Sequence, residues 1–482
     1  MTTAEARTYA YRAEDLPDGG ERRAATNAAR LGTIGLTDAG GSNVGGRPPQ
    51  RAGSRGLRAQ WEDWSGQVTS SGHNPGVISS LPPDGRLLFL TRSLRLFGYG
   101  VISVILALYL AEIGVSESRI GWLLTLTLAG DTAISLWMSA SADRAGRRRM
   151  LVLGALLVGA AGTVFASTEA YWLLVLAATV GVISPSGHEV GPFLSIEQAA
   201  LSQVVPDDHR TGVFAWYHLA GSLAGALGAL AGGGAVDLLQ RFGWTPLASF
   251  RGVIAVYAGL GLIMAGLFLR LTPAVEPPRV EDKAPQRWLG LHRSKRVVFK
   301  LSSLFALDAF GGGFVVQSMA VYWFHLRFGV EGTTLGAIFF SANILAGVSA
   351  FIAVWLARRI GLIPTMVVTH IPSNVLLMLV PLMPTLPLAV TVLLLRFSIS
   401  QMDVPTRQSY VMAVVEPDER SAAAGVTGVA RTAGAAISPA IAGTLLSVPS
   451  LIGVPYLLAG SIKLTYDLLL WRGFRASSRR SF

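Results

Sequence analysis

The 482-residue chain is 51% hydrophobic and only 14% charged, and it contains no cysteine. Soluble domains carry about 25% charged residues, so this composition excludes an ordinary soluble protein of this length. The lack of cysteine excludes disulfides, cysteine-ligated metals and thiol nucleophiles. The formal net charge is +11, and its meaning depends on where the basic residues lie along the chain.

Residues 1–85 differ in composition from the rest of the chain. They are rich in Gly, Ala, Ser and Arg, contain no apolar run that could form a core, and include the low-complexity stretch 40–56. We predict a disordered N-terminal tail there. The tail holds nine arginines and nine acidic residues, so the positive charge belongs to the remainder of the chain. The next methionine after Met1 is Met138, and a start site placed too far upstream would also explain this segment.

From residue 86 onward the chain is a series of apolar segments, each long enough to cross a bilayer as a helix. A long connection at 271–296 divides them into an N-terminal six-helix bundle (86–270) and a C-terminal one (297–473), followed by a basic tail at 474–482. Prolines inside the fourth and tenth segments predict kinks. The twelve predicted spans are 88–111, 119–140, 149–167, 171–203, 211–236, 248–270, 298–324, 333–357, 362–383, 387–415, 421–446 and 451–472.

The basic residues predict the orientation of these spans. They cluster after the second span, in the central loop, after the eighth span and at the C-terminus, whereas the opposite loops carry little beyond Arg119, Arg241 and Arg327. By the positive-inside rule, both termini and the central loop are cytoplasmic, and the chain is a multi-pass protein of the inner or plasma membrane. The positive net charge therefore reflects topology and does not indicate a nucleic-acid partner.

The two halves of the body resemble each other at three places, with offsets of 213, 215 and 210 residues. Three matches at nearly one offset predict a duplicated six-helix unit, the plan of transporters that rock two halves about a site at the bilayer midplane. The matching pairs are Leu94–Gly100 with Leu307–Gly313, Ala142–Gly146 with Ala357–Gly361, and Gln198 and Arg210 with Gln408 and Arg420.

The segment after the second span, Ser139–Arg149 (SASADRAGRRR), resembles the loop signature of the major facilitator superfamily, with Ser139 in place of the leading glycine. The resemblance covers residues 86–475 and implies an all-α polytopic fold of twelve transmembrane helices in two pseudo-symmetric six-helix bundles. It also implies that the loop carboxylate braces the cytoplasmic end of helix eleven and that the loop arginines hold the halves together. We expect Glu197 to pair with Arg144 or Arg147. The predicted gating residues are Asp143, Arg144, Gly146, Arg147, Arg148 and Glu197.

A few ionisable residues lie at membrane depth, where each charge costs a few kcal/mol unless a partner or water-filled cavity receives it. Arg95 lies nearer the cytoplasmic side and occupies the repeat position equivalent to Asp308, with opposite charge. Arg396 and Asp403 could instead neutralise each other or a neighbouring helix as structure alone, and Asp131 could face a cavity or pair with an arginine. The candidate proton- and substrate-binding residues are Asp131, Glu189, Asp308, Arg396, Asp403 and Arg95.

The resemblance implies a secondary active transporter that works by alternating access, most similar to the drug and metabolite exporters. We expect a monomer that exports a small molecule in exchange for protons, with Arg396 as a counter-charge or a contact for an anion. Uptake by symport or uniport is the alternative within transport, and a membrane receptor or scaffold is the alternative outside it. No nucleophile elbow, phosphate-cradling loop or metal-ligand cluster occurs, so we expect no enzyme activity, cofactor or metal.

The exporter prediction departs from the pattern of the family's proton antiporters in two places, and the first is the fourth span, which lacks the arginine that this subset often has. The fifth span lacks the glycine-proline signature typical of the family's proton antiporters, and the nearer match, Ser438-Pro439, lies in the eleventh span.

Overall fold

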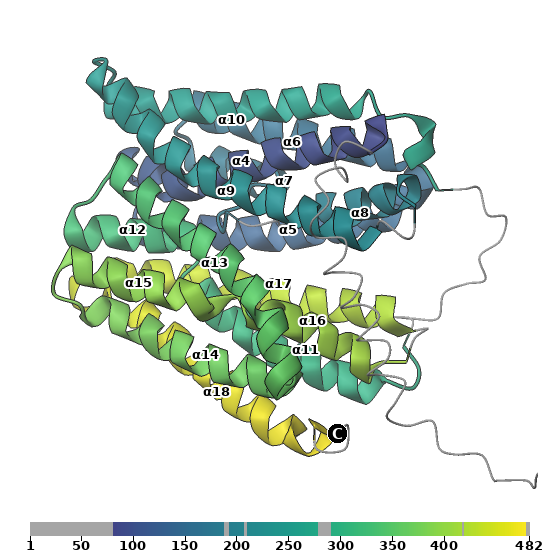
Figure 1. Cartoon of the computed structure of the whole chain (residues 1–482). Helices are drawn as coiled ribbons and strands as arrows, with labels where there is room; N and C mark the ends of the chain where they lie inside the picture. Colours follow the sequence, from purple (N-terminus) through teal and green to yellow (C-terminus); the bar gives the residue numbers. More distant parts are fainter. Residues whose placement is uncertain (1–80, 188–191, 207–209, 278–290, 417–418, 479–482) are drawn as a thin grey trace, which may run out of the picture. The chain divides into compact units, whose positions relative to one another are not determined.

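The computed structural model describes residues 81–187, 192–206, 210–277, 291–416 and 419–478, and these residues form helices and connections without a strand (Figure 1). The described helices traverse the body twelve times, as the sequence predicts. The first six traverses are α4 (Pro83–Glu112), α5 (Glu117–Ala145), α6 (Arg147–Ser167), α7 (Tyr171–Val180) with α8 (Phe193–Val204), α9 (Arg210–Arg241) and α10 (Pro246–Phe268). The second six are α11 (Lys295–Gly313) with α12 (Gln317–Phe328), α13 (Gly332–Ile360), α14 (Leu362–Leu379), α15 (Leu386–Ser400) with α16 (Asp403–Val414), α17 (Arg420–Leu446) and α18 (Val454–Ser478).

Three short 3-10 turns, η1 (Pro273–Val275), η3 (Val380–Leu382) and η5 (Pro449–Leu451), complete the described elements. The predicted tail up to residue 80, half of the central loop (278–290) and the last four residues lie outside the described residues.

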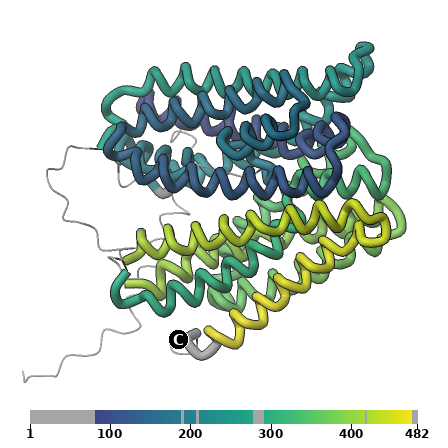
Figure 2. The backbone as a smooth tube through the Cα atoms, turned by 180° about the vertical axis from the view of Figure 1, so that it is seen from behind, coloured from purple at the N-terminus to yellow at the C-terminus, as the bar shows by residue number. Residues whose placement is uncertain are grey.

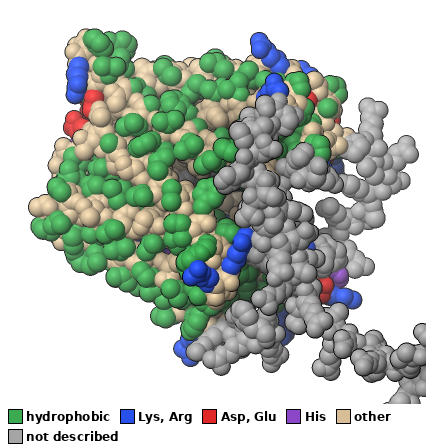
Figure 3. Space-filling view, viewed as in Figure 1, with side chains coloured by type: hydrophobic (Ala, Val, Ile, Leu, Met, Phe, Trp, Pro, Cys, Tyr) green, Lys and Arg blue, Asp and Glu red, His purple; other side chains and the backbone are tan. Residues whose placement is uncertain are grey.

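Ten of the described helices or continuous helix pairs are long and apolar enough to cross a membrane. The exceptions are the fourth traverse, which is split into α7 and α8, and α18, whose apolar run contains Lys463, Asp467 and Arg472. Large hydrophobic side chains such as Trp122, Trp172 and Leu176 are exposed. Hydrophobic side chains also dominate the face seen in Figure 3. A surface of this kind suits a lipid environment, so the fold is that of a multi-pass membrane protein.

Three traverses are broken in mid-course. The predicted kinks occur in the fourth traverse, where Pro192 is the N-cap of α8, and in the tenth, where Pro405 lies in the first turn of α16. Proline lacks a backbone N–H, and in the first turn of a helix that N–H would have no partner within the helix. The seventh traverse is also broken, at residues 314–316, although the sequence predicts a continuous span there. This break follows Gly311–Gly313, and consecutive glycines weaken a helix because they lose the most backbone entropy on folding.

The helices α4 to α10 form one bundle and α11 to α18 the other (Figure 2). Within a bundle, small residues let helices approach closely: a Cβ added to Gly100 of α4 would lie 2.1 Å from the carbonyl oxygen of Gly225 in α9. We call the end of the bundles where α4 begins and α18 finishes the terminal end, and the opposite end the distal end. The predicted orientation makes the terminal end cytoplasmic.

Candidate functional site

Asp308 is the centre of a buried charged cluster in the second bundle. Its carboxylate accepts hydrogen bonds from the Nζ of Lys463 in α18 at 2.6 Å and from the Nη1 of Arg407 in α16 at 2.9 Å. The Nε2 of His370 in α14 lies 3.7 Å from the same carboxylate. One aspartate of α11 therefore contacts side chains of three other helices, α14, α16 and α18.

His370 links Asp308 to a second carboxylate, Asp467. The Nδ1 of His370 lies 2.8 Å from Oδ1 of Asp467, and the amide of Asn374 donates to Oδ2 of Asp467 at 3.0 Å. When Nδ1 donates its proton to Asp467, the Nε2 of a neutral imidazole faces Asp308 as an acceptor. A proton added at Nε2 would therefore lie directly between His370 and Asp308.

Asp403 joins the cluster through Arg407. Its carboxylate lies 3.4 Å from Nη2 of Arg407, one helical turn further along α16. Asp403 is also the first residue of α16, where the helix dipole favours a negative charge. The structure therefore pairs Asp403 with Arg407 of the same helix, and Asp403 and Arg396 do not form an ion pair with each other.

Four members of this cluster are absent from the predicted candidate residues, namely Arg407, His370, Lys463 and Asp467. All four lie inside predicted spans, the ninth, the tenth and the twelfth. Lys463 and Asp467 could have been identified from the sequence, because they lie one helical turn apart in an otherwise apolar span and charges at membrane depth are costly.

The first bundle holds a matching buried pair, Arg95 of α4 with Glu197 of α8. The two nitrogens of the Arg95 guanidinium each lie 2.6 Å from an oxygen of Glu197, a bidentate geometry. The hydroxyl of Tyr217 in α9 donates to the same carboxylate. Both charged side chains are fully buried. The prediction that Glu197 pairs with Arg144 or Arg147 is wrong, because its side chain points into the bundle toward Arg95.

The two bundles therefore carry the same ion pair with the charges exchanged. Arg95 and Asp308 occupy equivalent positions on α4 and α11, at the offset of 213, and Glu197 and Arg407 occupy equivalent positions on α8 and α16, at the offset of 210. In the first bundle the cation lies on the first traverse, and in the second bundle the anion does. Both repeats therefore contain the ion pair, but the helix that carries the positive charge in one repeat carries the negative charge in the other.

Two partly buried arginines of the second bundle have no carboxylate within ion-pair distance among the described residues. Arg396 of α15 lies over the ring of Phe397, with 4.9 Å from its guanidinium carbon to the ring centre, and Arg431 lies on α17. Both are partly buried, and the Nε of each is buried without a hydrogen-bond partner. These two cations add to Arg407 and Lys463, so cations outnumber the carboxylates of Asp308, Asp403 and Asp467.

Asp131, a further depth candidate, lies in the first bundle, apart from this cluster. Asp131 is buried in α5, where the preceding Gly130 packs against α7: an added Cβ would lie 2.1 Å from the carbonyl oxygen of Thr179. Glu189 lies outside the described residues. Their roles in proton or substrate binding stay predictions.

The predicted gating loop forms a compact structure within the first bundle. Gly146, at φ +102°, ends α5 and starts α6, a backbone conformation that favours glycine. Arg147 lies 3.1 Å from Asp143 and donates to the carbonyl oxygens of Ala199 and Val275. The carboxylate of Glu276 accepts hydrogen bonds from the backbone N–H groups of Arg147 and Arg148. The side chain of Arg148 also donates to the carbonyl oxygen of Leu269. Arg144 is exposed. None of these described contacts reaches the second bundle, so in this conformation the expected brace on helix eleven is absent.

At the terminal end of the second bundle, Glu419 anchors the start of α11. Its buried carboxylate accepts the backbone N–H groups of His292, Arg293 and Ser294, the last two at 2.8 Å. Burial of this carboxyl opposes ionisation, but the hydrogen bonds from Ser294 and from these three amides outweigh it and lower the pKa of Glu419 to about 2.

We predict that this contact loses stability in acid. A carboxyl whose pKa is lower in the folded state stabilises the fold above its ordinary pKa of 4.5, and this stabilisation is lost as the pH falls from about 4.5 toward 2. Glu419→Gln should therefore lower the thermal unfolding midpoint near neutral pH and flatten its pH dependence in that window. Unfolding of purified protein between pH 6 and 2.5 measures this. Glu416→Gln, at an exposed carboxylate three residues away, is the control; equal profiles for the two variants would contradict the assignment.

The distal halves of the two bundles are packed tightly against each other. In the crossing of α5 and α17, a Cβ on Gly121 would lie 2.3 Å from the carbonyl oxygen of Pro439, and one on Gly443 would lie 2.3 Å from that of Glu117. The hydrogen bonds that join described residues of the two bundles all lie in this half. They connect Ser103 with Gln317 and Ser318, Pro185 with Ser318, Glu117 with Tyr322, Ser118 with Thr444, Thr125 with Ala440, and Asp237 with Thr333.

The chain thus forms two repeated membrane-spanning bundles that are joined at one end. Each bundle has a buried ion pair between its first and fourth traverses. This architecture is typical of a secondary transporter. The family model of the Major Facilitator Superfamily matches residues 88–439. The chain belongs to this superfamily of transporters.

Similar proteins agree with this assignment. An uncharacterized membrane protein of Saccharomyces cerevisiae is 32% identical over 417 residues, which cover 80% of this chain and 93% of that protein. A Na⁺, Li⁺, K⁺/H⁺ antiporter of Planococcus maritimus is 28% identical over 165 residues, covering 34% of this chain and 36% of that protein. The crystal structure of a bacterial homolog of the human lysosomal transporter Spinster, in an inward-facing and occupied conformation, superposes with a TM-score of 0.63 at 17% identity, covering 83% of this chain and 96% of that chain.

Proposed function

We propose that this transporter couples the export of a small molecule to the entry of protons, with Asp308 and His370 as the proton-binding pair. The observation that carries the proposal is the position of Asp308, whose single carboxylate holds Lys463 and Arg407 and faces His370. A proton on Asp308 would break both ion pairs at once. Because these pairs connect α11 to α16 and α18, proton binding can bias the arrangement of the second bundle.

The arrangement of the two bundles supports alternating access. They are bonded to each other in the distal half, while described residues at the terminal end form no hydrogen bond between bundles. Under the predicted orientation, with both termini in the cytoplasm, this arrangement corresponds to an inward-facing conformation. The partial match to a cation/proton antiporter supports exchange with protons.

Proton-coupled uptake is the second candidate, and the excess of cations in the second bundle favours it. A substrate with an anionic group could bind Arg396 and Arg431, together with the Lys463 and Arg407 side chains that protonation of Asp308 releases. Proton and substrate would then bind together, which gives cotransport. A cationic substrate would instead compete with protons for Asp308 and Asp403, which gives exchange.

The sign of a pH change distinguishes the two candidates. The purified chain is reconstituted into vesicles that contain a pH-sensitive dye, and a panel of anionic, cationic and neutral compounds is added outside. Exchange of an entering compound for protons makes the lumen more alkaline, whereas cotransport makes it more acidic. We expect Asp308→Asn to reduce the change in luminal pH, in either direction, by at least about tenfold. A tenfold reduction corresponds to a loss of about 1.4 kcal/mol of coupling free energy. The matched control is Glu331→Gln, at an exposed carboxylate before α13.

An undiminished signal in Asp308→Asn would contradict the role of Asp308. If no compound in the panel changes the luminal pH, proton coupling is contradicted. If, in addition, no compound enters the vesicles, the receptor or scaffold interpretation gains support.

A further inference from the structure

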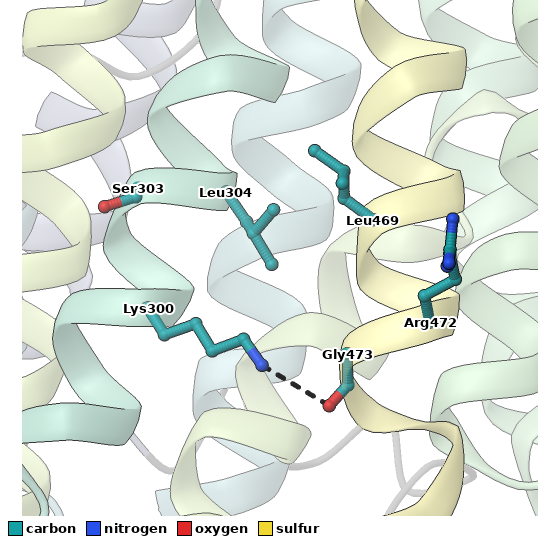
Figure 4. A pocket seen from close by; sticks show the side chains of 6 residues that line it. All are labelled: Lys300, Ser303, Leu304, Leu469, Arg472 and Gly473. Carbon is teal, nitrogen blue, oxygen red and sulfur yellow. Dashed lines mark hydrogen bonds between the residues drawn. The ribbon is translucent and has the colours of Figure 1, made fainter.

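A crevice lies between α11 and α18 on the outside of the second bundle, close to the terminal end (Figure 4). Its volume is about 480 Å³, and it is lined by Lys300, Ser303, Leu304, Leu469, Arg472 and Gly473. The two helices are close in mid-membrane, where a Cβ on Gly311 would lie 3.0 Å from the Cγ of Lys463. The crevice therefore opens where these helices separate toward the terminal end.

The mouth of the crevice is positively charged. Lys300 lies in the second turn of α11 and Arg472 near the end of α18, and none of the six lining residues is acidic. The Nζ of Lys300 makes only a long hydrogen bond of 3.5 Å to the carbonyl oxygen of Gly473 and lies 4.6 Å from the ring centre of Phe474. Among the described residues Arg472 has no ion-pair partner. Both cations are exposed and available to an external anion.

The deeper part of the crevice is apolar. Leu304 follows Lys300 by one turn of α11 and Leu469 precedes Arg472 by one turn of α18, and Figure 4 shows both leucine side chains in the space between the helices. The neighbouring Phe299 and Leu468 are exposed, as expected for side chains in contact with lipid chains. The crevice thus has a basic mouth at the membrane boundary and an apolar floor within the membrane.

We propose that this crevice binds an anionic membrane lipid, with the headgroup phosphate between Lys300 and Arg472 and an acyl chain along Leu304 and Leu469. Basic pockets between transmembrane helices are suited to anionic headgroups, because each nearby Lys or Arg adds attraction at the membrane surface. Phosphatidylcholine fits less well, since its own cationic group faces the same two cations. Free phosphate has no chain for the apolar floor. The proposal is independent of the transported compound and of the coupling ion.

A bound lipid would bridge α11 and α18, the two helices that also share the ion pair of Asp308 with Lys463. It would therefore stabilise the packing of these helices on the side facing the lipid. This consequence gives a readout that requires no knowledge of the transported substrate.

Lipid binding to the full chain tests the proposal. The purified protein is equilibrated in mixed micelles with equal amounts of phosphatidylglycerol and phosphatidylcholine, and the retained lipids are counted by native mass spectrometry. We expect wild type to retain phosphatidylglycerol preferentially. Lys300→Gln with Arg472→Gln should weaken its binding by about tenfold, and each single variant should produce part of the loss. Added phosphatidylglycerol should raise the thermal unfolding midpoint of wild type more than that of the double variant.

The matched control is Arg358→Gln with Arg359→Gln, which removes two exposed cations from the terminal end of another helix, α13. Retention of phosphatidylglycerol should be unchanged in this control. If both double variants lose phosphatidylglycerol equally, the crevice is not the binding site, and general attraction between basic residues and anionic lipid explains the retention. Unchanged retention in Lys300→Gln with Arg472→Gln would overturn the proposal. Stabilisation of wild type by soluble glycerol phosphate to the same extent as by phosphatidylglycerol would also overturn it, because no chain would then be required.

Discussion

Asp308→Asn is expected to destabilise the second bundle by about 3–5 kcal/mol, because removal of one partner leaves buried charges uncompensated. The carboxylate lies 2.6 Å from Lys463 and 2.9 Å from Arg407, and all three side chains are largely buried. Asparagine keeps the shape and one acceptor oxygen but loses the negative charge. Lys463 would then lose its carboxylate partner, and Arg407 would keep only Asp403, at 3.4 Å.

A double-mutant cycle isolates the pair of Asp308 with Lys463. Lys463→Met removes the cation while keeping an unbranched apolar side chain. The double variant should lose clearly less stability than the sum of the single variants, with a coupling energy of about 1–3 kcal/mol. Unfolding of the protein in mixed micelles by increasing denaturing detergent measures each free energy.

Asp143→Asn is the control for the cycle. It removes a carboxylate of the same type from a pair with Arg147 in which the Asp143 side chain is 58% exposed. Exposed pairs contribute about 0–1 kcal/mol, so the control should be nearly neutral. A loss in Asp308→Asn no larger than in Asp143→Asn would show that the cluster does not stabilise the bundle.

Gly443→Val is expected to open the distal contact between the bundles. A Cβ at this position would lie 2.3 Å from the carbonyl oxygen of Glu117 and 2.8 Å from the α-carbon of Gly121, and backbone atoms cannot rotate away. Overpacking of this kind costs about 1–3 kcal/mol. Because the cost applies only while the distal halves are in contact, it shifts the population toward conformations in which they separate.

The lack of cysteine in the natural chain provides a clean reporter for this shift. Ser103 is fully buried in the contact with α12, and Ser103→Cys introduces a single thiol there. On this background, Gly443→Val should raise the labelling rate by a membrane-impermeant maleimide about tenfold, as expected for a population shift of about 1.4 kcal/mol.

The control for the distal contact is Gly347→Val on α13, where an added Cβ would have no atom within 4 Å. Its labelling rate should match that of the Ser103→Cys parent. If Gly443→Val also leaves the rate unchanged, the α5–α17 crossing does not determine closure. If the control rises equally, the effect is general loosening of the helices.

Much of the fold could be predicted from the sequence, because membrane spans are local features. A helix in lipid must satisfy its own backbone and present apolar side chains, so its length and hydropathy are visible in one stretch of residues. The boundaries of α6 and α9, for example, lie within a few residues of the predicted spans 149–167 and 211–236, apart from the distal end of α9. The break between α11 and α12 was not predicted, because three glycines are also compatible with a continuous, tightly packed helix.

The candidate site was predicted only in part. Asp308 and Arg95 could be selected because a charge at membrane depth is costly wherever it occurs. Their partners could not, since Lys463 and Glu197 lie 155 and 102 residues away, and which helix faces meet depends on packing. Glu197 shows this directly: its position near the loop favoured Arg144 or Arg147, but the rotation of α8 directs its carboxylate to Arg95.

The sequence by itself determined the membrane class of the protein, its duplication and the small set of charges buried in it. Each of these follows from composition, periodicity or repetition along the chain. Only the tertiary structure decided which charges neutralise one another, that the ion pair is repeated with exchanged polarity, and that the bundles are bonded in their distal halves. These features depend on contacts between helices far apart in the chain, and such contacts are set by the packing of whole helix surfaces.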